Sequence, residues 1–258
     1  ARREAAGLLS GAPLPALGVT SVDLSDLLRF FDHPPRAFLR RLGIVLPEAE
    51  AAATDHERFD LGGPLQIHQL RKEGCDQASA ADELVRDWQR RGRIPAGALG
   101  RQLAWPLIAQ ADALRADSDA DRVGSVTREV RVDLGHGRRL IGVSEPGREG
   151  LGPVLIHPGK HSLRYLVRTW IHGLAWQAMG GTGAGRCWQL TSACKPKAWD
   201  VPAPLAADGA RALLQALVAT RDAGLRRPLP LLPDLVEAWA KAADDVEGLD
   251  AARQCWSA

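Results

Sequence analysis

The chain has 258 residues, of which 45% are hydrophobic and 25% are charged, and its formal net charge is +2. This composition is typical of a globular domain large enough to bury its own core, and it excludes a disordered or fibrous chain. The small net charge excludes binding of nucleic acid through overall charge, so any DNA contact must come from local basic patches.

The first residues differ in character from the rest of the chain. Residues 1–20 are punctuated by glycine and proline and lack a sustained hydrophobic period, which predicts a linker. They show no secretory signal, and no apolar run reaches the roughly 18 residues that cross a membrane, so we expect a cytoplasmic protein without membrane contact. Because the chain begins at Ala1 rather than at methionine, we expect it to be part of a longer protein.

Helical periods dominate the first half of the chain. Ser25 is expected to cap a helix that ends before His33 and Pro34, and the prolines are expected to open a second helix with Phe38 on its apolar side. The other side of that helix carries three arginines, Arg36, Arg40 and Arg41. Apolar spacing predicts further helices over 65–73, 76–91 and 98–116, the last bent or interrupted at Pro106.

The hydrophobic period then changes to two. Alternating valines predict a strand over 125–134, and a glycine-rich turn predicts a hairpin into a second strand over 139–143. The remaining predicted elements are a strand over 153–157, a helix over 162–178, a strand pair within 187–199, and helices over 206–223 and 233–244. This order predicts one α/β domain over 21–258 with a mixed sheet, helical over about 21–120 and sheet-containing over about 121–258.

Five segments carry a family resemblance. They are SVDLSDLLRFFDHPPRAFLRRLGI, DHERFDLGGPLQIHQL, RRGRIPAGALG, LRYLVRTWIHGLAWQ and ARALLQALVATRDAGLRRPLPLLPDLVEAWA. In this order they resemble landmarks of the C-terminal nuclease-like domain of the RecC family, the gamma subunit of exonuclease V, over about residues 20–245. The resemblance implies the PD-(D/E)xK restriction-endonuclease-like fold, a mixed sheet flanked by helices.

The resemblance also indicates where a nuclease site would lie. Active relatives hold Mg²⁺ with an acid on one strand and an acid-x-Lys on the next, because carboxylates fix the ion while the lysine helps to position the attacking water. Here Glu145 stands in for the first acid and Lys160 for the lysine, but residues 154–159 contain no carboxylate. We therefore interpret Glu145 and Lys160 as remnants of a degenerate site, and expect no catalytic residue, no metal and no cofactor.

By this resemblance the chain is expected to be a non-catalytic DNA-handling and scaffold domain of a RecBCD-type helicase–nuclease that acts in double-strand break repair and homologous recombination. The expected partners are RecB-like and RecD-like subunits, and DNA as a duplex end or as single strands. Guanidinium groups bind backbone phosphates without sequence preference. The candidate DNA-binding residues are therefore two clusters, Arg36, Arg40 and Arg41, and Arg226 and Arg227. The alternative is that these arginines form solvated helix surfaces.

Two other functions remain as alternatives. An active Mg-dependent DNA nuclease would need a relocated acid, such as Glu129 or Asp133, beside Glu145 and Lys160. The glycine-rich residues 180–185 could form a nucleotide-binding loop, but no Gly-Lys-Ser or Gly-Lys-Thr follows them, which favours a flexible loop. The four cysteines lack the spacing of zinc or iron–sulfur ligands, which favours buried or idle thiols.

Overall fold

The computed structural model describes residues 13–44, 61–76 and 81–229, together with residues 236, 247, 248 and 250. Within these residues, helices come first, then strands that enclose one helix, and then a further helix, which confirms a mixed α/β fold. Apart from residue 236, the helix predicted over 233–244 lies outside the described residues.

Two short helices follow a three-residue strand. Strand β1 spans Ser21–Asp23, helix α2 spans Leu24–Asp32, and helix α3 spans Pro34–Arg41. The prediction that Ser25 caps α2 is wrong: the cap is Asp23, whose carboxylate accepts a 2.7 Å hydrogen bond from the backbone N–H of Ser25. His33 caps α3, because its Nδ1 accepts a 3.1 Å hydrogen bond from the backbone N–H of Arg36, and Pro34 occupies the first helical position.

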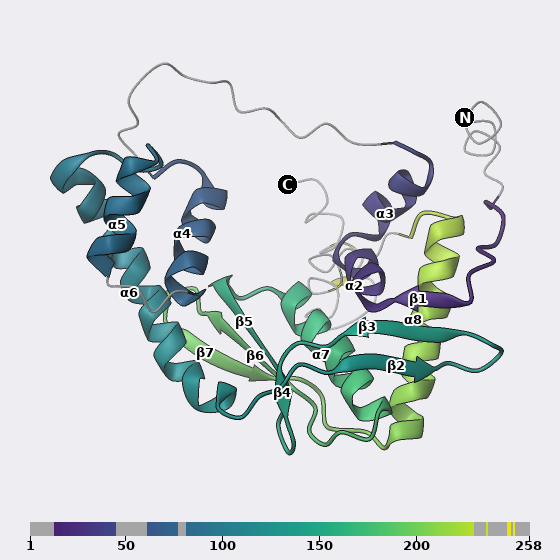
Figure 1. The fold of residues 1–258 in the computed structure, drawn as a ribbon. Helices are drawn as coiled ribbons and strands as arrows, with labels where there is room; N and C mark the ends of the chain where they lie inside the picture. The colour runs from purple at the N-terminus through teal and green to yellow at the C-terminus, as the bar shows by residue number, and fades with distance from the viewer. Residues whose placement is uncertain are drawn as a thin grey trace.

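Three further helices lie together at one end of the molecule (Figure 1). They are α4 (Pro64–Asp76), α5 (Ala81–Arg90) and α6 (Gly97–Arg122). Trp88 of α5 is fully buried in their common core with Leu70 and Ile108. Helix α6 continues past Pro106 and beyond its predicted end at 116. Its last turn is buried through polar side chains that contact the sheet, and such side chains leave no hydrophobic period for the sequence to show.

The strands form two mixed sheets rather than one. In the first sheet, β3 (Arg139–Val143) pairs in parallel with β1 and antiparallel with β2 (Glu129–Asp133). The second sheet has the order β4 (Gly147–Arg148), β5 (Gly152–Lys160), β6 (Arg186–Leu190) and β7 (Pro196–Asp200). Strands β5 and β6 are parallel, and the other pairs of this sheet are antiparallel. An antiparallel bridge from Val126 to Gly147 joins the chain before β2 to β4.

Helices α7 (Leu163–Ala178) and α8 (Ala207–Arg226) complete the fold. The main core lies between the first sheet and helices α2, α7 and α8, where Leu27, Val130, Leu140, Leu174 and Leu214 are almost wholly inaccessible to solvent. Each such side chain stabilises the fold by roughly 1.5–3 kcal/mol relative to an exposed one. Helix α7 also packs on β5 and β6, so it links the two sheets.

Two strands differ from their predicted bounds for physical reasons. Strand β1 has only three residues, too few for a hydrophobic period to predict it. Strand β5 was expected to end at 157, where a proline and a glycine follow, but it continues to Lys160 through a register shift after Ile156. The position of Lys160 relative to the sheet therefore does not follow from its spacing in the sequence.

Candidate functional site

A cavity of about 380 Å³ lies among helices α4 and α7, strand β5, the loop after β3 and the end of α6. Its charged or titratable lining residues are His68, Lys72, Cys75, Asp76, Arg122, Glu145, His157, Tyr165 and Arg168. These residues come from separate stretches of the sequence, and only the fold brings them together. Glu145, the predicted remnant acid, thus faces a cavity that three cations and one further carboxylate also line.

Glu145 is held by its backbone against helix α7. Its N–H donates a 3.2 Å hydrogen bond to Nδ1 of His172, so a neutral His172 carries its proton on Nε2. This Nε2 is buried without a hydrogen-bond partner among the described residues and lies 4.0 Å from Oε1 of Glu145. Burial lowers the pKa of His172 to about 4, with a smaller contribution from Arg168. Burial also raises the pKa of the Glu145 carboxyl, an effect that Arg168 opposes.

One wall of the cavity is a set of aromatic rings. The ring of His157 stacks on Tyr165 with centroids 3.4 Å apart and lies 5.0 Å from the ring of His68. Burial lowers the pKa of His157 to about 3, and the neighbouring His68, Arg164 and Arg168 add to this effect. His157 is therefore neutral at physiological pH, which makes its ring a wall of the cavity rather than a source of charge.

Two of the three cations of the cavity are available to an anion. Neither Lys72 nor Arg122 forms an ion pair with another residue in the described ranges, whereas Arg168 lies 3.2 Å from Asp32 of helix α2. Sequence reasoning missed Lys72, Arg122 and the second carboxylate, Asp76. They lie on α4 and at the end of α6, and their spacing forms no recognisable motif.

The other predicted nuclease residues lie away from this cavity. Lys160 is exposed at the end of β5 and does not line it. Glu129 pairs with Arg131 at 2.6 Å, and Asp133 accepts a 2.8 Å hydrogen bond from the turn after β2, so neither relocated acid reaches Glu145 in this arrangement. In the part of the chain that the structure describes, no group of three or more His, Cys, Asp and Glu side chains could hold a metal ion.

The two predicted arginine clusters lie beside each other, because helix α3 packs on α8. The Arg41 guanidinium donates to the backbone carbonyls of Leu225, at 2.7 Å, and Pro15, at 2.5 Å. Nε of Arg226 donates to the carbonyl of Leu14 at 3.0 Å. Arg41 and Arg226 therefore hold the segment before β1 against the end of α8, a structural role that the sequence did not indicate.

The remaining members of these clusters differ in accessibility. Arg40 and Arg227 are exposed near this junction, and Arg36 is half-buried at the start of α3. Arg40 and Arg227 are therefore the members best placed to meet a phosphate.

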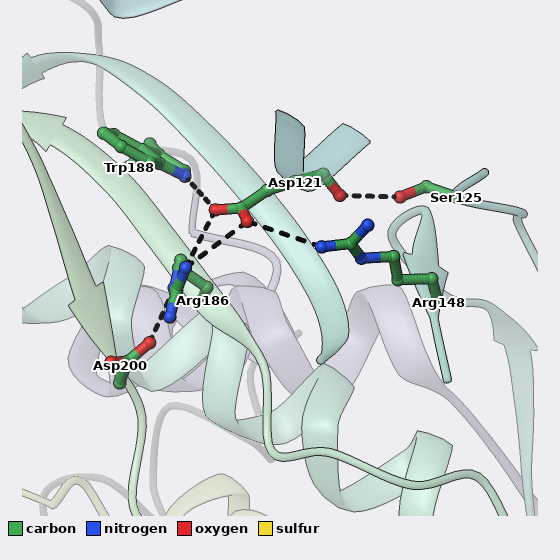
Figure 2. Close-up of polar contacts among 6 residues, drawn as sticks. All are labelled: Asp121, Ser125, Arg148, Arg186, Trp188 and Asp200. Carbon is green, nitrogen blue, oxygen red and sulfur yellow. Dashed lines mark hydrogen bonds and ion pairs between the residues drawn. The ribbon is translucent and has the colours of Figure 1, made fainter. Parts of the chain in front are cut away.

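A buried ion network joins α6 to the second sheet (Figure 2). Asp121 is 7% exposed and accepts hydrogen bonds from the indole N–H of Trp188, at 2.8 Å, and from Arg186, at 3.2 Å. Arg186 also pairs with Asp200 at 2.7 Å, and Arg148 of β4 lies 3.8 Å from Asp121. The network fixes the end of the helix that carries Arg122, and hence one side of the cavity.

The glycine-rich loop has a packing role. The backbone N–H and the hydroxyl of Thr182 donate to the carboxylate of Glu149, at 2.8 and 2.7 Å, and these bonds lower the pKa of Glu149 to about 2. A Cβ at Gly183 would lie 2.3 Å from the carbonyl carbon of Leu151, so a glycine is needed where the loop meets the turn before β5. The anion bound by this loop is a side chain of the protein itself.

The fold and cavity together define a mixed α/β domain with a cation-lined cavity beside Glu145. The protein-family model of the RecC C-terminal domain matches residues 19–244, which is most of the chain. The chain therefore belongs to the RecC family.

Curated relatives agree with this assignment. The chain is 32% identical over 261 aligned residues to RecBCD enzyme subunit RecC of Mycobacterium tuberculosis, covering 94% of this chain and 22% of that protein. It is 29% identical to RecBCD enzyme subunit RecC of Escherichia coli, covering 91% of this chain and 21% of that protein. The chain thus spans about a fifth of the length of these relatives. A crystal structure of SSO0001 covers 85% of this chain and 83% of its own with 11% identity and a TM-score of 0.30, too low to show a shared fold.

No helix in the described ranges combines the length and the apolar character that a membrane crossing requires.

Proposed function

We propose that this chain is a non-catalytic DNA-handling and scaffold domain of a RecBCD-type helicase–nuclease subunit, acting in double-strand break repair and recombination. The proposal includes a PD-(D/E)xK-like fold whose nuclease site is degenerate. Membership of the RecC family supports the assignment to this complex. The observation that carries the non-catalytic role is the lining of the cavity at Glu145, where three cations accompany one further carboxylate and where Lys160 takes no part.

The chemistry of Mg²⁺ explains why this cavity is a poor nuclease site. Mg²⁺ requires near-octahedral oxygen ligands and is commonly held by one or two carboxylates together with substrate phosphates. Burial raises the pKa of the Glu145 carboxyl because it disfavours the charged form, which is the form that binds a cation. Asp76 is the other carboxylate of the lining, but Lys72 and Arg122 line the same cavity and oppose a bound dication.

Contact with DNA is proposed for the exposed arginines. Arg40 and Arg227 can bind backbone phosphates, while Arg41 and Arg226 hold the surface that presents them. With a net charge of only +2, the isolated chain is expected to bind DNA weakly, and the assembly with RecB-like and RecD-like subunits supplies the remaining affinity. A cytoplasmic location is part of this proposal.

A cleavage assay tests the non-catalytic role. The purified chain is incubated with linear single-stranded and double-stranded DNA in Mg²⁺ or Mn²⁺, and we expect no cleavage. Glu145→Gln and Lys160→Ala serve as matched variants. Cleavage that either variant abolishes would show a working nuclease and overturn the proposal, whereas cleavage that neither variant changes would come from a contaminating enzyme.

A further inference from the structure

One stretch of the sequence has an excess of positive charge that the net charge of the chain conceals. Residues 150–199 contain no aspartate or glutamate, but they contain six of the chain's lysines and arginines. Three of these, Lys160, Lys195 and Lys197, are exposed where β5 ends and the β6–β7 hairpin turns. The carboxylates that border this stretch are already bound, Glu149 by Thr182 and Asp200 by Arg186.

The backbone pairing brings the three lysines together. Lys160 lies opposite Leu190 of β6, and Leu190 lies opposite Pro196 of β7, which separates Lys195 from Lys197. Two strand spacings therefore separate Lys160 from this pair, about 10 Å of backbone distance. At this backbone separation, one bound strand of polyanion is long enough to reach all three lysines.

Aromatic rings accompany these lysines. The ring of His161, the residue after Lys160, stacks on the indole of Trp199 with centroids 4.5 Å apart and an interplanar angle of 20°. The ammonium of Lys197 lies 5.3 Å from the centre of the Trp199 ring. His161 is exposed and Trp199 is half-buried on the edge strand β7, so the stack reaches solvent beside the lysines.

We propose that this lysine–tryptophan surface, made of Lys160, His161, Lys195, Lys197 and Trp199, binds single-stranded DNA. An unpaired base extends the His161–Trp199 stack, and the three lysines bind the phosphates on either side of it. Aromatic platforms flanked by cations bind single strands without sequence preference, because every base has a π-face. A duplex keeps its bases stacked on one another and cannot use the platform. The inference rests on the proposed DNA-handling function and specifies single-stranded DNA as the form that this surface binds.

The test is fluorescence anisotropy of a labelled oligothymidylate of about 16 nucleotides, measured with the purified chain at about 50 mM salt. A duplex of equal length is measured in parallel. Trp199→Leu removes the aromatic ring and should weaken single-strand binding about tenfold, whereas Trp199→Phe should retain most of the affinity. Lys195→Ala combined with Lys197→Ala should lower the salt slope of single-strand binding by about 1.4, which is two phosphate contacts. Duplex binding should change little in all three variants.

A matched control removes a charge elsewhere. Arg101→Ala removes an exposed cation from α6 and should leave single-strand binding unchanged. Thermal unfolding confirms that each variant is folded. Single-strand binding that is indifferent to Trp199→Leu and to the lysine changes, but is lost on charge reversal at Arg40 and Arg227, would overturn this inference and leave the proposed function standing. Absence of binding to both forms of DNA by the unaltered chain would contradict this inference alone, because the proposed function assigns the remaining affinity to the assembly.

Discussion

The carboxylate of Asp121 accepts a 2.8 Å hydrogen bond from the indole N–H of Trp188, and this contact joins the last turn of α6 to strand β6. Asp121 is buried and also faces Arg186 at 3.2 Å. The Trp188 indole N–H and one side of Arg186 share this buried carboxylate as their acceptor. Its removal therefore leaves buried donors unpaired and destabilises the junction.

The first prediction concerns this junction. Asp121→Ala leaves the Trp188 indole N–H and one side of Arg186 without an acceptor, and it should lower the free energy of unfolding by roughly 2–3 kcal/mol. Asp200→Ala removes the exposed partner of the same arginine and should cost less than about 1 kcal/mol. Urea unfolding measures both variants. If the two variants lose the same free energy of unfolding, the burial of Asp121 does not contribute to the stability of the junction.

The second prediction concerns pH. Burial holds the folded-state pKa of His172 at about 4 and that of His157 at about 3, below their ordinary value of 6.5. The unfolded chain therefore binds more protons than the folded chain between these values, so stability is fully present above the unfolded pKa and is lost as the pH falls. At about pH 5 each histidine should account for a loss of roughly 2 kcal/mol relative to neutral pH.

The variant His172→Asn tests this prediction. It removes the titrating group and can still offer an acceptor to the backbone N–H of Glu145. The loss of stability between about pH 7.5 and about pH 5 should become smaller by the contribution of one histidine. His161→Asn, at an exposed position, is the control. If the His172→Asn variant loses as much stability in acid as the unaltered chain, His172 is not held neutral by burial.

The third prediction separates the members of one arginine cluster. Arg41→Ala leaves the carbonyls of Leu225 and Pro15 without its hydrogen bonds, and it should lower the free energy of unfolding by about 1–3 kcal/mol. Arg40→Ala, on the same helix but exposed, should change it by no more than about 0.5 kcal/mol. The comparison uses urea unfolding. A larger loss for Arg40→Ala than for Arg41→Ala would contradict the structural role of Arg41.

The fourth prediction uses two glycines with nearly the same backbone conformation. Gly180 and Gly183 have φ values of +86° and +88°, so an alanine at either position costs about 1–2 kcal/mol of backbone strain. At Gly183 the new Cβ would also lie 2.3 Å from the backbone of Leu151, whereas at Gly180 it meets nothing within 4 Å. Gly183→Ala should therefore lower the thermal midpoint further than Gly180→Ala does. Equal midpoints would show that the loop does not pack closely on this turn.

The sequence predicted the elements that carry a clear hydrophobic period. The hairpin of β2 and β3 and helix α7 lie close to their expected positions, because each buries one face at the spacing of its own type. The cap of α2 was placed wrongly because Asp23 and Ser25 are both good capping residues, and only the backbone conformation distinguishes them.

The site was less predictable than the fold. Glu145 was found because it follows a predicted strand at the place the family resemblance indicates. Lys72, Asp76 and Arg122 were missed because contacts between distant elements, not local spacing, bring them to the cavity. The acid-free stretch 150–199 was visible in the sequence, but its meaning depends on the strand pairing that gathers its lysines.

The most direct test of the DNA-handling role is the rate at which a reconstituted complex unwinds linear duplex DNA, with the chain in its full-length subunit and RecB-like and RecD-like subunits present. Arg40→Glu and Arg227→Glu together reverse two exposed charges without touching the contacts of Arg41 and Arg226. We expect slower unwinding whose dependence on salt becomes shallower, because fewer phosphate contacts release fewer counterions, with the fold and subunit association intact. Unchanged unwinding, processivity and RecD-like subunit association would contradict it and identify these arginines as solvated surface.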